Sequence, residues 1–257
     1  MKKLLASKPK KLIELGQIWQ LGEHRLLCGS STDLKAINRF LKNIIIDAII
    51  TDPPYGAMAV EGKEGFATLK KNKKILNDDI KTETEYSKFC REWLTLAIPY
   101  LARKNSVYIF NSDKMLFALK ATLDEVDIHF SQLIIWIKNH IVIGRKDYLP
   151  QHELIIFGWF GTHTFRRSKD KTVLCYPKPN KSPLHPTMKP VSLMRHLILN
   201  AVPLGGTVYD PFGGSGTTLI AAEQIKRRCF IVELDLEYCA TIINRWEKST
   251  NQKAKLL

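Results

Sequence analysis

The residues best equipped for chemistry follow an apolar run of strand length, residues 44–50. They are Asp52, Pro53, Pro54 and Tyr55. The two prolines stiffen the backbone and direct its carbonyl oxygens outward, beside a carboxylate and a flat ring with a polar tip. Such a group can hold an exocyclic amino group by two hydrogen bonds while the ring stacks on the base that carries it. The alternative is a Pro-Pro turn closing a buried strand, with Asp52 as a helix cap.

A second group lies near the other end of the chain. A strand ending at Asp210 leads into a glycine-rich turn and a helix, and the next strand ends in Glu233. Glycines let a backbone approach a ligand closely, and an acid after the next strand can bind a ribose diol. This order of elements predicts a nucleotide-type binding unit, or else a tight strand–helix turn that binds no ligand.

Two common versions of that unit are excluded. The dinucleotide fingerprint fails because Leu219 stands where its third glycine belongs, and no Lys-Ser/Thr pair follows the turn as a P-loop requires. A nucleoside with another tail fits better. S-adenosylmethionine combines adenosine, a ribose diol, an ammonium and a carboxylate, and Asp210 could accept a hydrogen bond from that ammonium.

The elements that must position these residues alternate between strands and helices, which is typical of an α/β domain. Apolar, β-branched runs predict strands at 25–30, 44–50, 106–111, 128–138, 153–159, 207–210 and 229–233. Helical periodicity predicts helices at 33–42, 82–101, 113–124, 219–225 and 235–247, the second opening with a capping-box pattern. A further helix is expected after residues 185–190, with Leu193, Met194, Leu197 and Ile198 on its inner face.

Composition limits the class of protein. With 257 residues and 45% hydrophobic residues, the chain has the size of one large domain, with no apolar run of membrane-spanning length and no signal peptide pattern. Five cysteines without a C-x-x-C pair argue against a disulfide framework and a zinc site, and favour a reduced, cytoplasmic compartment. The net charge of +14 favours a polyanion, nucleic acid above all, although each basic cluster by itself could be a solvated surface.

Taken together, the two groups resemble the β group of DNA amino-methyltransferases, whose D-P-P-Y motif precedes the F-x-G-x-G cofactor motif. Here Asp52 to Tyr55 precede Phe212 to Gly216 by about 160 residues, and the stretches 185–190 (HPTMKP) and 135–138 (IWIK) also look familial. The resemblance covers residues 17–247 as a single domain. It implies the Rossmann-like α/β fold of methyltransferases that use S-adenosylmethionine, with a mostly parallel seven-stranded sheet containing one antiparallel strand, and it predicts that the Asp52 strand lies beside the glycine-turn strand.

The same resemblance implies roles for individual residues. Asp52 and the Pro53 carbonyl, in the Asp52-Pro53-Pro54-Tyr55 motif, would accept hydrogen bonds from the target amine, and Tyr55 would stack on the extruded base. The cofactor residues would be Asp210, Phe212, Gly213, Gly214, Ser215, Gly216, Thr217 and Glu233, with Thr187 and Lys189 near the cofactor carboxylate. One position departs from the family: an acid that meets the cofactor adenine in many relatives is replaced by Ser30, with Asp33 three residues later.

The implied substrate is double-stranded DNA with the target base flipped out, methylated at adenine N6. Residues 57–80 are expected to be a mobile basic loop and residues 139–183 a target-recognition insert. The expected DNA contacts are Lys70, Lys71, Lys73, Lys74, Arg145, Lys146, Arg166 and Arg167. Transfer to cytosine N4, an RNA substrate and a non-catalytic binding subunit are the alternatives. The sequence leaves open whether a cognate restriction endonuclease is a partner and whether the protein forms a dimer.

Overall fold

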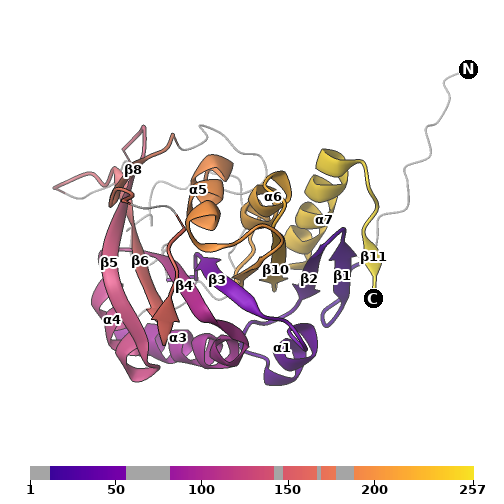
Figure 1. The fold of residues 1–257 in the computed structure, drawn as a ribbon, viewed down its shortest axis with the longest axis horizontal. Helices are drawn as coiled ribbons and strands as arrows, with labels where there is room; N and C mark the ends of the chain where they lie inside the picture. Colours follow the sequence, from indigo (N-terminus) through magenta and orange to yellow (C-terminus); the bar gives the residue numbers. More distant parts are fainter. Residues whose placement is uncertain (1–11, 56–81, 142–146, 167–168, 178–187) are drawn as a thin grey trace, which may run out of the picture.

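The computed structural model describes residues 12–55, 82–141, 147–166, 169–177 and 188–257. One sheet with helices on both faces makes up the molecule (Figure 1). Its strands are β1 (Ile18–Leu21), β2 (His24–Cys28), β3 (Ile46–Thr51), β4 (Leu101–Asn111), β5 (Ile128–Ile137), β6 (His152–Phe160), β7 (Thr162–His163), β8 (Val173–Cys175), β9 (Thr207–Asp210), β10 (Arg228–Glu233) and β11 (Lys255–Leu256).

The strand order is β11-β1-β2-β10-β9-β3-β4-β6-β5-β8, and β7 pairs with β4. Strands β2, β10, β9, β3 and β4 pair in parallel, while β6 is antiparallel to both β4 and β5. The run from β2 to β5 therefore contains seven strands with one antiparallel member, as predicted. The predicted number of strands was too low, because short strands of two to four residues (β1, β7, β8, β11) are too short to show an alternation of apolar and polar residues.

The helices cover the sheet in two layers (Figure 1). Helices α1 (Leu34–Phe40), α3 (Glu83–Ala97) and α4 (Leu116–Glu125) pack on one face, and α5 (Val191–Ala201), α6 (Thr217–Gln224) and α7 (Leu236–Thr250) on the other. Strand β3 serves both layers, because successive side chains of a strand point to opposite faces. Ala48 and Ile50 join one hydrophobic cluster, and Ile49 between them joins the other.

Local signals set the helix ends. The side chain of Thr82 accepts a hydrogen bond from the Glu85 N–H in the predicted capping box that starts α3. That helix ends at Ala97 rather than near 101, because Pro99 turns the chain into a short 3-10 helix, η1 (Ile98–Tyr100), before β4. Of the helices that the structure describes, none is long and apolar enough to cross a membrane.

Candidate functional site

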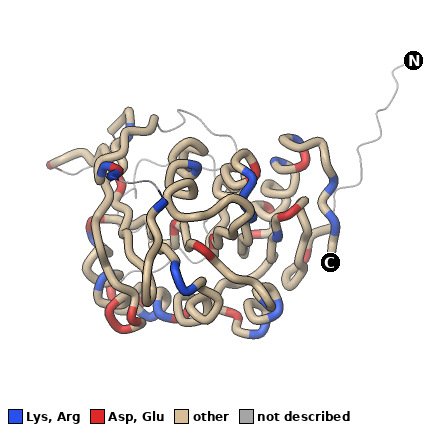
Figure 2. The backbone as a smooth tube through the Cα atoms, in the orientation of Figure 1, with Lys and Arg blue, Asp and Glu red and all other residues tan. Residues whose placement is uncertain are grey.

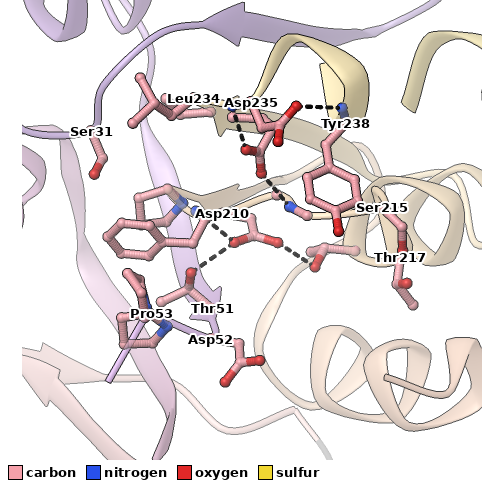
Figure 3. A pocket seen from close by; sticks show the side chains of 18 of the residues that line it. Ser31, Thr51, Asp52, Pro53, Asp210, Ser215, Thr217, Leu234, Asp235 and Tyr238 are labelled. Carbon is pink, nitrogen blue, oxygen red and sulfur yellow. Dashed lines mark hydrogen bonds between the residues drawn. The ribbon is translucent and has the colours of Figure 1, made fainter. Parts of the chain in front are cut away.

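A cavity opens at the carboxyl ends of β3, β9 and β10, where open α/β sheets bind their ligands (Figure 3). Both groups found in the sequence line it. Its walls are formed by Gly29, Ser30, Ser31, Thr51, Asp52, Pro53, Pro54, Tyr55, Phe110, Met188, Lys189, Met194, Asp210, Pro211, Phe212, Gly213, Gly214, Ser215, Thr217, Thr218, Val232, Glu233, Leu234, Asp235 and Tyr238.

The two groups are joined by the sheet itself. Strands β3 and β9 are neighbours, with Ala48 opposite Val208, which confirms the prediction that the two strands lie side by side. At their ends the Thr51 hydroxyl donates a hydrogen bond to Asp210 Oδ1 over 2.7 Å (Figure 3). Residues about 160 positions apart in sequence are thereby fixed to one another in the floor of the cavity.

Asp210 is the most enclosed acid of the cavity, with 3% of its surface exposed. Besides Thr51, it accepts hydrogen bonds from the Phe212 N–H at 3.1 Å and the Thr218 hydroxyl at 2.6 Å. Burial raises its pKa to about 6 in spite of these donors. The carboxylate therefore holds the start of the glycine turn in place.

The glycine turn has a shape that other residues cannot adopt easily. Gly214 and Gly216 have positive φ angles of 51° and 78°. A side chain at Gly213 would place its Cβ only 2.6 Å from Ile231 Cγ1. Phe212 stabilises the turn, because its ring packs against the rings of Phe89 and Trp93.

Glu233 closes the turn from the end of β10. Its two carboxylate oxygens accept hydrogen bonds from the Gly214 N–H at 2.6 Å and the Asp235 N–H at 2.8 Å (Figure 3). Burial raises its pKa to about 7. Asp235 caps α7 and lines the same wall. Two acids beside a close-approach turn form an acceptor set that suits the diol of a ribose.

Asp52 lies across the cavity floor from Asp210 (Figure 3). Its Oδ2 is 2.5 Å from Lys189 Nζ, whereas its Oδ1 is buried and has no hydrogen-bond partner among the described residues. Burial raises the pKa of Asp52, and the nearby ammonium of Lys189 opposes that rise. A buried acceptor without a donor is costly, so Oδ1 is suited to receive a donor from a ligand.

Most of the predicted site residues meet in this cavity, but a few do not. Asp33 is outside it, because its carboxylate accepts hydrogen bonds from the N–H groups of Lys35 and Ala36 as the cap of α1. Ser30 does line the cavity, whereas Gly216 acts only through the shape of the turn. Thr187 lies outside the described residues.

The predicted DNA contacts are mostly beyond the described residues. Lys70, Lys71, Lys73 and Lys74, the expected loop 57–80, Arg145, Lys146 and Arg167 all fall in undescribed segments. Arg166 is described and exposed. The described part of residues 139–183 is built into the sheet through β6, β7 and β8. Described basic residues are spread over both helix layers in Figure 2, so they mark no single stripe.

Sequence reasoning missed several residues of the site. Met188, Met194 and Phe110 supply apolar wall, and Tyr238 projects into the cavity from the first turn of α7 (Figure 3). The sequence predicts only a strand at Glu153 on β6, yet its carboxylate is 3.0 Å from Lys189 Nζ. Because Glu153 and Lys189 are far apart in sequence, no sequence motif links them. An acidic residue in an otherwise apolar strand was the one feature of the sequence that pointed to Glu153.

The fold and the site together define a nucleotide-binding α/β domain with an acceptor carboxylate beside the ligand cavity. A family model described as DNA methylase, for N6 and N4 methyltransferases, matches residues 46–174 and 166–244. The chain therefore belongs to this DNA methylase family.

Known proteins agree with that assignment. The type II methyltransferase M.HpaI of Haemophilus parainfluenzae is 26% identical over 255 residues, covering 89% of this chain and 76% of its own length. A crystal structure of an M1.HpyAVI–SAM complex is 25% identical with a TM-score of 0.63, covering 86% of this chain and 98% of that one. The cytosine-N4-specific PvuII DNA methyltransferase, at 18% identity, shares the fold with a TM-score of 0.68 over 90% of this chain and 92% of its own.

Proposed function

We propose that this DNA methyltransferase transfers a methyl group from S-adenosylmethionine to the exocyclic N6 of adenine in double-stranded DNA. The observation that carries the proposal is the buried Oδ1 of Asp52, which has no hydrogen-bond partner among the residues that the structure describes and lies in the same cavity as Tyr55 and the glycine turn. The cofactor half and the acceptor half of the reaction then meet without any large movement of the sheet.

The residues of the cavity match the parts of this cofactor. Glu233 and Asp235 offer acceptors to the ribose diol, and the turn before α6 directs its backbone toward a ligand. Asp210 carries negative charge for an ammonium, and we assign Ser30 and Leu234, which line the same cavity, to the adenine of the cofactor. When bound, S-adenosylmethionine supplies an electrophilic methyl group on a sulfonium.

Residues of the chain itself prepare the target amine for methyl transfer. The lone pair of an aromatic amine is delocalised into its ring, so the amine is a weak nucleophile. Hydrogen bonds from the amino hydrogens to Asp52 Oδ1 and the Pro53 carbonyl favour a more tetrahedral nitrogen with a freer lone pair. Tyr55 holds the base flat, and most of the rate comes from this positioning and from fixed charges. The target base must leave the duplex, which costs a few kcal/mol of unstacking.

The choice of adenine rests on the D-P-P-Y form of the motif and on the resemblance to adenine enzymes. Cytosine N4 is the second candidate, because the matched family includes both amines and the fold of the PvuII enzyme is shared. The pairing with a restriction endonuclease belongs to the same proposal, since M.HpaI is a type II methyltransferase.

The test is a direct analysis of the product. Mixed-sequence duplex DNA is incubated with the protein and S-adenosylmethionine deuterated in the methyl group, then digested to nucleosides and analysed by mass spectrometry. We expect deuterated N6-methyldeoxyadenosine. Deuterated N4-methyldeoxycytidine instead would move the assignment to cytosine. Label in neither nucleoside, with label appearing in RNA or nowhere, would overturn the proposal.

A further inference from the structure

Four buried or half-buried charges form a chain beside the cavity. Lys189, 7% exposed, is 2.5 Å from Asp52 Oδ2 and 3.0 Å from Glu153 Oε2. The other oxygen of Glu153 is 2.9 Å from Nζ of Lys138, which is 6% exposed. Two ammonium groups thus face two carboxylates, and the set is neutral as a whole.

Separate elements bring this chain of charges together. Lys189 immediately precedes the cap of α5, Glu153 is on β6, Lys138 directly follows β5, and Asp52 directly follows β3. The ammonium of Lys189 also lies over the ring of Phe110, 4.9 Å from its centroid. Buried charges are tolerated only when they are paired, and here each of four elements supplies one member of the paired set.

The pairing divides the two oxygens of Asp52. Oδ2 is held by Lys189, while Oδ1 is buried and without a partner among the described residues. With one oxygen fixed, the carboxylate cannot rotate freely, and Oδ1 keeps a single direction. This is the oxygen that the proposed function gives to the target amine.

We infer that Lys189 is a positioning residue for methyl transfer: it holds Asp52 through Oδ2 and aims Oδ1 at the amine, while Glu153 holds Lys189 in turn. The inference rests on the proposed role of Asp52 as the amine acceptor. It gives Lys189 a partner in the acceptor half of the site, whereas the family resemblance had placed it near the cofactor carboxylate.

The electrostatic surroundings favour this role. Burial raises the pKa of Asp52, and Lys189 is the strongest opposing influence. Burial would also raise the pKa of Glu153, but the ammonium groups of Lys189 and Lys138 lower it to about 2, so it stays ionised. Further groups that interact electrostatically with this pocket are the Asp210 carboxyl and the phenols of Tyr55 and Tyr86. Among the described residues, Lys189 alone forms an ion pair with Asp52.

The experiment compares two lysine variants of the full-length protein. Lys189→Met removes the ammonium that touches Asp52. Lys138→Met is the matched control, because Lys138 is equally buried and shares Glu153 but does not touch Asp52. Single-turnover methylation of duplex DNA is measured from pH 5.5 to 9.5 with saturating S-adenosylmethionine, and the cofactor dissociation constant is measured separately.

The acid limb is the part of the pH profile in which the rate falls as the pH is lowered. For Lys189→Met we expect the midpoint of this limb to shift to a pH about one to three units higher, because Asp52 loses the opposite charge that favours its ionised form. The rate at neutral pH should fall by at least about tenfold and recover partly at high pH. The cofactor dissociation constant should change by less than about threefold, since the contact is not with the cofactor. Lys138→Met should move the limb by less than half as much.

Glu153→Gln is a second test variant, and its effect does not depend on placing a methionine at a buried position. It removes a negative charge near Asp52, so the acid limb should move down while the rate falls, because Lys189 loses one of its two anchors. A purely structural lesion would lower the amount of folded protein without moving the limb.

The inference is overturned if Lys189→Met and Lys138→Met have the same acid limb, or if Lys189→Met weakens cofactor binding manyfold while the single-turnover rate is unchanged. The proposed function fails in a different way: the wild-type protein would then transfer no methyl group to DNA, or Asp52→Ala would retain transfer. An active wild type with an inactive Asp52→Ala therefore isolates the result for Lys189.

Discussion

Thr51→Val tests the link between the two halves of the site. Valine has nearly the shape of threonine, but it removes the hydroxyl that donates to Asp210 Oδ1 at 2.7 Å. Both residues are buried, with 1% and 3% of their surfaces exposed. Asp210 would keep the Phe212 N–H on that oxygen and the Thr218 hydroxyl on the other. The change therefore removes one of three donors from a buried acid.

The expected cost depends on pH. The pKa of Asp210 in the folded protein is raised to about 6, above its unfolded value near 4. Ionised Asp210 therefore opposes folding: its unfavourable contribution is absent below about pH 4 and complete above about pH 6, where it amounts to about 3 kcal/mol. Losing a hydrogen bond to the charged form costs about 1.5–3 kcal/mol, and to the neutral form about 0.5–1.5 kcal/mol. We expect Thr51→Val to destabilise by about 2 kcal/mol at pH 7.5 and about 1 kcal/mol at pH 5.

The assay is urea unfolding at both pH values, with Thr122→Val as the control. Thr122 is fully buried and donates to the Ala118 carbonyl at 2.9 Å, a neutral acceptor, so its cost should not depend on pH. Both variants are compared with wild type at the same pH, which cancels the titration of Glu233. Equal destabilisation by Thr51→Val at the two pH values would refute the assignment of Asp210 as a buried acid held by Thr51.

Two further predictions concern the cofactor turn. Gly216→Ala should lower the free energy of unfolding by about 1–3 kcal/mol, because φ is 78° and the new Cβ would lie 2.9 Å from Ile242. The control is Gly205→Ala, where φ is 71° but the space around the new Cβ is open. In the same thermal melts it should lower the free energy of unfolding by only about 1 kcal/mol. Equal costs would argue against the close packing at Gly216. Glu233→Gln should flatten the pH dependence of cofactor affinity, which in wild type should weaken as pH falls through about 7, because the neutral acid is a poorer acceptor. Calorimetric titration at pH 6 and 8 measures this, and an equally steep profile in the variant would contradict the role of Glu233.

Much of the fold followed from local patterns. Apolar, β-branched runs located the central strands, and the Thr82 capping box marked the start of α3. The neighbouring positions of β3 and β9 followed from a physical requirement, because both motifs must open on the same edge of a parallel sheet. The short edge strands and the early end of α3 at Pro99 were misjudged, since pairing across a sheet depends on partners distant in sequence.

The site was predictable as far as its motifs extended. Asp52, Asp210 and Glu233 stand at strand ends beside punctuating prolines or glycines, which made them visible. Glu153 was not visible, because its function comes from a lysine that approaches from another element. The sequence could not distinguish two roles for Asp33, because an acid after a turn suits an adenine contact and a helix cap equally. In the structure Asp33 caps α1.

The central claim is that Asp52 accepts the target amine in a cavity that also binds S-adenosylmethionine. Asp52→Ala tests it most directly, because Lys189 keeps Glu153 as a partner and the folded protein should survive. Single-turnover methyl transfer to duplex DNA and the cofactor dissociation constant are measured on the same preparation. The account predicts that transfer is lost while cofactor binding stays within about threefold of wild type. Retained transfer in Asp52→Ala would contradict it.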